Sequence, residues 1–127
     1  GGRRFSDSCS TDIFIHMDGQ EVFKFAVKSV PTAIETLLHN NNMDVNDVDK
    51  FILHQANVRI IESVAKRLKA DKDKFPVNLN EYGNTSSASI PILLDELNRN
   101  GSLKQGEKLV LAGFGAGLSW GSILLVW

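Results

Sequence analysis

The segment KFILHQANVRIIESVAKRLK, residues 50–69, contains the change of pattern that decides the fold. Lys50–Leu53 is a short, largely apolar run that polar residues follow at once, which is typical of a buried strand. From Asn57 to Lys69 apolar residues return every three or four positions, which predicts an amphipathic helix. Because a buried strand followed directly by such a helix is characteristic of α/β proteins, we expect this class of fold.

The segments that flank this unit alternate in the same way between helical and strand patterns. In chain order they predict a helix, a strand, a helix and two strands, at residues 20–41, 75–79, 85–99, 108–112 and 120–126. A glycine-rich turn at residues 113–117 joins the last two strands. This order predicts helices packed on a mostly parallel mixed sheet whose last strand is antiparallel.

Length and charge limit the classes of function. The chain has 127 residues, which suits one domain. Its 14 basic and 15 acidic residues give a net charge of -1, so neither nucleic acid nor a membrane is expected as a partner. The chain shows no apolar run of about 20 residues that could span a bilayer and no signal-peptide pattern, so we expect a cytoplasmic protein.

The first residues differ in composition from the rest of the chain. Residues 1–10, GGRRFSDSCS, are mostly glycine, serine and charged residues, so we expect a flexible tail over residues 1–12 and one domain over residues 13–127. The single Cys9 lies in this tail, without a strand-to-helix turn that would lower the pKa of its thiol. We therefore do not expect Cys9 to act as a nucleophile.

Three polar or glycine-rich segments lie where ligands gather in α/β proteins. They follow predicted strands or precede predicted helices, at residues 54–57, 82–86 and 114–117. Because the carboxyl ends of parallel strands and the starts of the next helices meet at one edge of the sheet, all three are candidates to face one cleft.

Each segment has a structural and a chemical interpretation. A neutral His54 at a helix start can donate an N–H to a developing oxyanion, or it simply fills the corner between strand and helix. Asn84 is a helix cap or a further donor, and the glycine-rich turn is a plain hairpin or a source of backbone N–H donors. The residues alone leave these alternatives open.

Metal-binding patterns are absent from the sequence. The three histidines do not have the spacing of metal ligands, and the aspartates at residues 44, 47 and 49 lack the central glycine and terminal glutamate of a calcium loop. We therefore expect no metal and no other cofactor.

Four motifs resemble one family when they are taken together in this order. They are MDGQEVFKFAV at 17–27, HQAN at 54–57, YGNTSSAS at 82–89 and GFGAGLSWG at 113–121. Together they resemble the carboxyl-terminal half of β-ketoacyl-acyl-carrier-protein synthase III, the condensing enzyme that starts bacterial fatty-acid synthesis. The resemblance extends from about Ile13 to Trp127.

The resemblance implies that the chain is one of the two similar α/β halves of a thiolase-like fold. It also implies a homodimer for the intact enzyme, and a nucleophilic cysteine that belongs to the amino-terminal half, which the chain does not include. In the family the first strand of the carboxyl-terminal half would precede residue 1. The sheet would then be incomplete, or it would be completed by another chain or by residues 13–15.

The same resemblance implies roles for candidate catalytic groups. The family's cysteine takes an acyl group from acyl-CoA, after which malonyl-acyl-carrier protein is decarboxylated and joined to it in a Claisen condensation. His54 and Asn84 match the pair that donates hydrogen bonds to the malonyl thioester oxygen. The backbone of Gly115 and Ala116 matches the oxyanion hole for the acyl thioester.

Further residues match contacts to the substrates' larger parts. Asn57 and Gly19 match positions beside the pantetheine arm of CoA or the carrier protein. Arg59, Lys66 and Lys24 match the basic surface that receives the acidic acyl carrier protein. Without the resemblance, the same basic residues would be interpreted as an ordinary solvated helix face.

Two rival functions remain on the sequence alone. One is a related ketosynthase or acyltransferase of secondary metabolism with the same motifs. The other, from a different class, is a carrier-protein or CoA binding module that lacks catalysis.

Overall fold

The computed structural model describes residues 17–127 of the chain. The expected tail at residues 1–12, with Cys9, and the expected strand residues 13–15 lie outside the described residues. Among the helices of residues 17–127, none combines the length and the apolar content needed to cross a membrane.

The described residues form an α/β unit with one three-stranded sheet. The helices and strands in chain order are α1 (Gly19–Asn40), β1 (Lys50–Leu53), α2 (Val58–Leu68), α3 (Leu79–Tyr82), α4 (Ser89–Arg99), β2 (Lys108–Gly115) and β3 (Ser119–Val126). Short 3₁₀ turns occupy Val45–Asp47, Lys72–Lys74 and Ser86–Ala88. The strand order is β1-β2-β3, with β1 parallel and β3 antiparallel to β2. The expected α/β class and the antiparallel last strand are confirmed.

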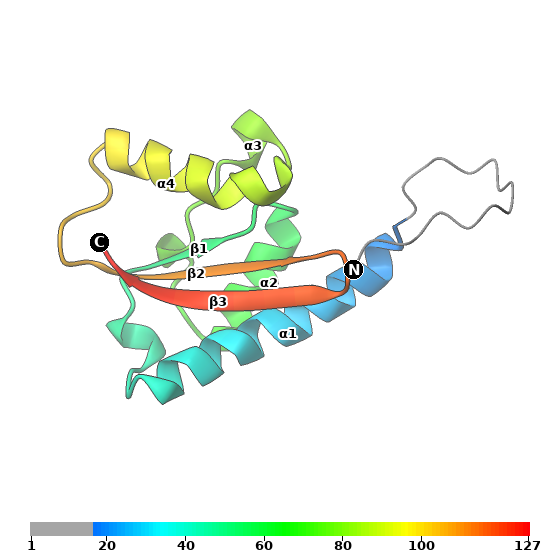
Figure 1. Cartoon of the computed structure of the whole chain (residues 1–127), viewed down its shortest axis with the longest axis horizontal. Coiled ribbons are helices and arrows are strands. Elements are labelled where there is room, and N and C mark those ends of the chain that lie inside the picture. Colours follow the sequence, from blue (N-terminus) through cyan, green and yellow to red (C-terminus); the bar gives the residue numbers. More distant parts are fainter. Residues whose placement is uncertain (1–16) are drawn as a thin grey trace, which may run out of the picture.

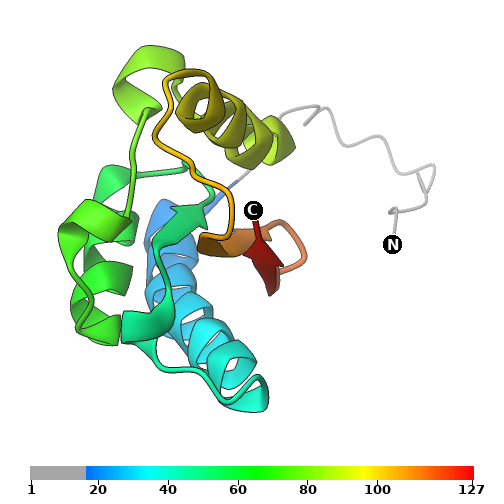
Figure 2. The ribbon, with the colours of Figure 1, turned by 90° about the vertical axis from the view of Figure 1, so that its left-hand side faces the viewer.

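Helices cover both faces of the sheet, with α1 and α2 on one side and α4 on the other (Figures 1 and 2). The alternation of side chains along β1 explains both cores, because successive strand residues point to opposite faces. Phe51 and Leu53 belong to the core under α1 and α2, whereas Ile52 belongs to the core under α4. Both faces of β1 are buried, which explains why residues 51–53 are all apolar instead of alternating with polar residues.

Polar side chains cap the first turns of α1 and α2. The Asp18 carboxylate accepts the N–H groups of Gln20 and Glu21 at 3.0 and 3.1 Å, which caps α1. The Asn57 side-chain oxygen accepts the N–H of Arg59 at 2.8 Å, which caps α2. These caps satisfy backbone donors that have no partner inside the helix.

The predicted strand at residues 75–79 is wrong. Phe75 is buried and its ring stacks on Phe51, with the two ring centroids 4.6 Å apart, and α3 already begins at Leu79. Pro76 has no backbone N–H, and the N–H of Asn78 donates to the Gln55 side chain at 3.2 Å instead of to a neighbouring strand. The segment is therefore held by side-chain contacts and not by a strand ladder.

Two other predicted boundaries also move. The predicted helix at 85–99 divides into the 3₁₀ turn Ser86–Ala88 and α4, because Pro91 has no N–H to bond the carbonyl of residue 87. The predicted glycine-rich turn at 113–117 is shorter, since residues 113–115 continue β2 and pair with residues 119–121. Glycines adopt extended backbone as readily as turn backbone, so glycine content alone did not end the strand.

Candidate active site

The carboxyl edge of the parallel pair holds the first candidate residue. Leu53 pairs with Ala112 as the last position of β1, and the N–H of His54 donates to the Ala112 carbonyl at 2.9 Å. The start of α1, the end of β1, the β2–β3 turn and the start of α4 all lie at this end of the molecule (Figure 1). The fold therefore brings the sequence-predicted site segments to one edge.

His54 is partly buried, and its ring is held by two neighbours. Its Nδ1 atom lies 2.6 Å from the hydroxyl oxygen of Ser89, the first residue of α4. The Phe114 ring of β2 meets it edge-to-face, with ring centroids 5.3 Å apart and planes at 69°. These contacts give the imidazole one defined orientation.

Burial also sets the protonation state of His54. Loss of solvent around the ring lowers its pKa below the ordinary value of 6.5, because the charged form loses more hydration than the neutral form. The neutral form of the ring is therefore favoured at pH 7. A neutral imidazole has one N–H donor and one acceptor nitrogen, so the nitrogen that carries the proton decides what the ring can do.

A polar network begins at Gln55, the residue that follows His54. Gln55 is only 1% exposed, and its side chain donates to the Leu53 carbonyl at 2.8 Å and accepts the N–H of Asn78. The Asn78 amide in turn donates to the Glu96 carboxylate of α4 at 2.7 Å. The network ties the end of β1 to the loop before α3 and to the middle of α4.

Sequence reasoning missed three members of this site: Gln55, Asn78 and Ser89. The only local signal was at Gln55, a polar residue that directly follows a buried strand, where an unpaired side chain would be costly. The partners of Gln55 lie 23 and 34 residues further along the chain, beyond the range of any periodic pattern.

Asn84 lies in the exposed segment between α3 and the Ser86–Ala88 turn. Its side-chain oxygen accepts the N–H of Ser86 at 3.0 Å, which closes a local turn. The helix-cap interpretation is wrong, because the residues before the Ser86–Ala88 turn and before α4 are Thr85 and Ala88. The bond to Ser86 uses only the oxygen and directs the two hydrogens of the Nδ2 group elsewhere. Within residues 17–127 no hydrogen bond joins Asn84 to His54, which instead contacts Ser89 at the start of α4.

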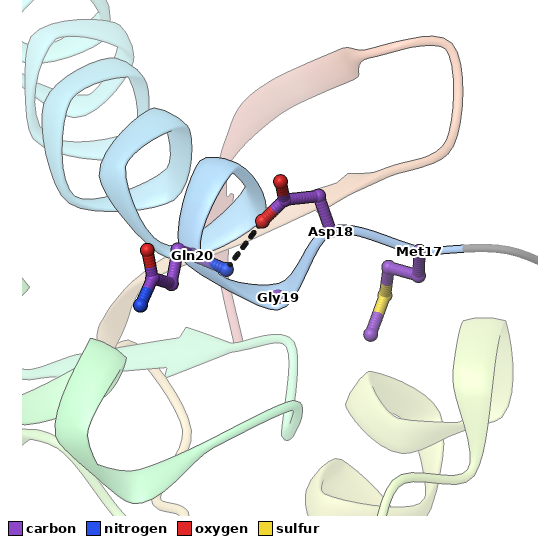
Figure 3. Close-up of a pocket in the computed structure, with 4 residues that line it drawn as sticks. All are labelled: Met17, Asp18, Gly19 and Gln20. Carbon is purple, nitrogen blue, oxygen red and sulfur yellow. Dashed lines mark hydrogen bonds between the residues drawn. The ribbon is translucent and has the colours of Figure 1, made fainter.

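Asn57 and Gly19 both lie at helix starts. Asn57 is the exposed cap of α2, as described above, and its amide nitrogen is not part of that cap. Gly19 is the first residue of α1 and lines a shallow hollow with Met17, Asp18 and Gln20 (Figure 3). A Cβ atom added at Gly19 would meet no atom within 4 Å, so the fold itself does not require glycine there.

The candidate oxyanion backbone lies at the tip of the hairpin. Gly115 is the last residue of β2 and pairs with Ser119, and Ala116 begins the exposed turn. The Ala116 carbonyl accepts the Ser119 hydroxyl at 2.9 Å. This bond tightens the turn that follows the two candidate residues.

The candidate basic residues lie on α1 and α2, which pack together. The Arg59 guanidinium of α2 lies 6.0 Å from the ring centroid of Phe23 in α1. Lys24 is the next residue of α1, and its Nζ pairs with Glu21 at 2.8 Å. Lys66 is exposed two turns further along α2, and residues seven apart share a helix face. The structure therefore places Arg59 against the α1 residue that precedes Lys24, and Lys66 lies on the same face of α2 as Arg59.

Comparison with known proteins places this chain in a family. Residues 38–127 match the family model described as the C-terminal part of 3-oxoacyl-[acyl-carrier-protein (ACP)] synthase III. The chain belongs to this family. Beta-ketoacyl-[acyl-carrier-protein] synthase III of Clostridium tetani is 54% identical over 114 residues, which are 90% of this chain and 34% of that protein. The chain thus spans about a third of the length of the curated relatives it matches.

Solved structures agree with this assignment to the synthase III family. The 3-oxoacyl-[acyl-carrier-protein] synthase III of Aquifex aeolicus matches with a TM-score of 0.87 at 42% identity, over 90% of this chain and 37% of that chain. The priming β-ketosynthase from the R1128 polyketide pathway matches with a TM-score of 0.79 at 38% identity, over 87% and 34%. The expectation of one half of a thiolase-like fold is confirmed by these matches.

Proposed function

We propose that the chain is the carboxyl-terminal half of a condensing acyltransferase that starts fatty-acid synthesis. The intact enzyme joins acyl-CoA with malonyl-acyl-carrier protein by decarboxylative Claisen condensation. The observation that carries the proposal is His54, a neutral and oriented imidazole at the carboxyl edge where α2 and α4 begin. In a synthase III sequence this placement suits a donor to a developing oxyanion.

The residues of this half serve the decarboxylation step. When the bond from the malonyl α-carbon to its carboxylate breaks, carbon dioxide leaves and the electron pair spreads to the thioester oxygen as an enolate. N–H groups of His54 and Asn84 donate to that oxygen. The enolate carbon then attacks the acyl thioester on the cysteine, whose sulfur leaves as thiolate. In a site without water, each such donor contributes about 3 to 4 kcal/mol.

Other residues hold the thioesters in place. The backbone N–H groups at Gly115 and Ala116 donate to the acyl thioester oxygen during transfer to and from the cysteine. Asn57 and Gly19 contact the pantetheine arm, which both substrates carry. Their positions at helix starts of the same edge support this assignment.

The nucleophile and a second half of the site come from outside this chain. The hairpin exposes large apolar side chains, a surface that commonly marks an interface, at Leu118, Trp120, Ile123 and Val126. An amino-terminal half that supplies the cysteine covers part of this surface, and the intact enzyme is a cytoplasmic homodimer.

Activity of the chain by itself provides the first test of the proposed function. Intact protein that contains this chain should convert acetyl-CoA and malonyl-carrier protein to a ketoacyl product, whereas the purified 127-residue chain should form none. Covalent catalysis needs a nucleophile held within bonding reach of the thioester. Mass spectrometry of the products and of acyl adducts on the protein makes the measurement.

Two results would contradict parts of this proposal. Product from the 127-residue chain that disappears in Cys9→Ala would make Cys9 the nucleophile. An intact protein that binds both substrates without turnover would instead support a non-catalytic binding module.

The basic surface predicts a selective effect on the carrier protein. Arg59→Glu should raise the KM for malonyl-carrier protein roughly tenfold and leave the KM for acetyl-CoA unchanged, because charge reversal repels an acidic partner protein. The loss should shrink with added salt, which screens exposed charges. Lys72→Glu makes the same charge change beyond the far end of α2 and should have no such effect. Equal losses for both substrates would favour the solvated-face interpretation.

A priming ketosynthase of polyketide synthesis is the second candidate, because one such enzyme is 38% identical over 87% of this chain. On this second proposal the intact enzyme would carry out the same two steps with a different starter acyl group. Competition of several acyl-CoA substrates for the intact enzyme, with products identified by mass spectrometry, separates the two candidates.

A further inference from the structure

The contact between His54 and Ser89 specifies more than the ring's orientation. Ser89 is 2% exposed, and its hydroxyl oxygen lies 2.6 Å from His54 Nδ1. The same oxygen accepts the backbone N–H of Gln55 at 3.2 Å. Ser89 therefore links the start of α4 to two consecutive residues at the end of β1.

Counting hydrogens decides the direction of the short bond. A serine hydroxyl has one hydrogen to donate and two lone pairs to accept. The N–H of Gln55 already uses one lone pair. Among residues 17–127, His54 Nδ1 is the one acceptor that lies within hydrogen-bond distance of this hydroxyl. Buried hydroxyls are nearly always satisfied, so the hydrogen points at Nδ1.

The opposite arrangement leaves a buried group unpaired. If Nδ1 carried the proton, it would donate to the serine oxygen, which would then accept two bonds. The hydroxyl hydrogen would have no acceptor in this part of the structure, which is unfavourable in a buried site. The same argument disfavours the doubly protonated ring, since that form also has a proton on Nδ1.

We propose that Ser89 is a positioning residue that donates to His54 Nδ1 and thereby holds the proton of the neutral ring on Nε2. The consequence for catalysis rests on the proposed function, in which the Nε2–H group donates to the thioester oxygen. With the other tautomer the ring would present a lone pair to that oxygen and repel it. Ser89 thus selects donation over acceptance at the catalytic nitrogen.

Neighbouring contacts keep the Ser89 hydroxyl next to the His54 ring. The Gln55–Asn78–Glu96 chain of hydrogen bonds holds α4 against the end of β1, so the hydroxyl cannot withdraw without breaking a buried network. The Phe114 ring packs edge-to-face on His54. A flipped imidazole would bring a carbon atom to the hydroxyl and lose the bond.

The tautomer can be measured without any assay of activity. In intact protein labelled with ¹⁵N-histidine, two-bond ¹H–¹⁵N correlation spectra at pH 8 identify the protonated ring nitrogen. His54→Gln assigns the signals by their loss. We expect a single Nε2–H tautomer for His54 in the unmodified protein and in Ser89→Thr, which keeps the hydroxyl. In Ser89→Ala we expect a measurable fraction of the Nδ1–H tautomer.

A matched control and a kinetic readout complete the experiment. Ser87→Ala removes an exposed hydroxyl two residues away and should leave the spectrum and the rates unchanged. Ser89→Ala should lower kcat for malonyl decarboxylation about tenfold, with KM unchanged, and Ser89→Thr should recover most of this loss. An Nδ1–H tautomer in the unmodified protein, or a Ser89→Ala spectrum identical to it, would overturn the role of Ser89.

The outcomes separate this inference from the proposed function. If the Ser89→Ala spectrum changes as expected while decarboxylation does not, Ser89 does fix the tautomer and the role of His54 in decarboxylation is wrong. If the spectrum is unchanged while removal of the His54 side chain abolishes decarboxylation, the proposed function stands and the role of Ser89 fails.

Discussion

His54→Ala in the intact protein should lower malonyl decarboxylation by about 10² to 10³-fold, the usual loss for one oxyanion donor. Transfer of the acyl group from acyl-CoA to the enzyme should stay close to the unmodified rate, because that step uses the cysteine and the backbone at Gly115 and Ala116. Release of ¹⁴C-labelled carbon dioxide measures the first step, and acylated protein in the mass spectrum measures the second.

His54→Gln separates hydrogen-bond donation from bulk. The glutamine amide nitrogen reaches a position near that of the histidine Nε2 and still offers an N–H group. His54→Gln should therefore retain more decarboxylation activity than His54→Ala. Both variants remove the bond to Ser89, so circular dichroism spectra should match before the rates are compared. Decarboxylation at the unmodified rate in His54→Ala would remove His54 from the mechanism.

Sequence patterns predict most of the helices and strands because each of these elements is determined by residues close together in the chain. The periodicity of residues 57–69 sets α2, and the apolar run before it sets β1, each within a few neighbouring residues. The failure at residues 75–79 has a different origin. There the apolar side chain of Phe75 stacks on Phe51 and the N–H of Asn78 bonds the Gln55 side chain, across separations of more than twenty residues.

The same difference between local and long-range information applies to the residues of the candidate site. His54 is recognisable in the sequence because it directly follows a strand, whereas Ser89 gives no sign of its role in a segment rich in serine. Its contact with His54 spans 35 residues and depends on how α4 packs across the sheet. Residues that act through a neighbour are therefore found only when the fold brings the two together.

Asn84→Asp should reduce malonyl decarboxylation at least as much as His54→Ala does, by about 10³-fold. The aspartate keeps the side-chain oxygen that accepts the Ser86 N–H, so the local turn should be preserved. It replaces the Nδ2 donor with a second oxygen and adds a negative charge beside the enolate. The substitution therefore removes the proposed chemistry and keeps the observed structural contact.

The effects on decarboxylation and on stability together decide whether Asn84 is a structural turn residue or a catalytic donor. A residue that only accepts the Ser86 N–H in the local turn tolerates aspartate, which keeps that acceptor oxygen, and loses stability when alanine replaces it. A catalytic donor shows the same large loss of decarboxylation with aspartate and with alanine, while acyl transfer continues. Thermal unfolding midpoints and decarboxylation rates of both variants make the comparison. An active Asn84→Asp enzyme beside a less stable Asn84→Ala enzyme would leave Asn84 only the role of closing the local turn, and His54 would then need another partner at the thioester oxygen.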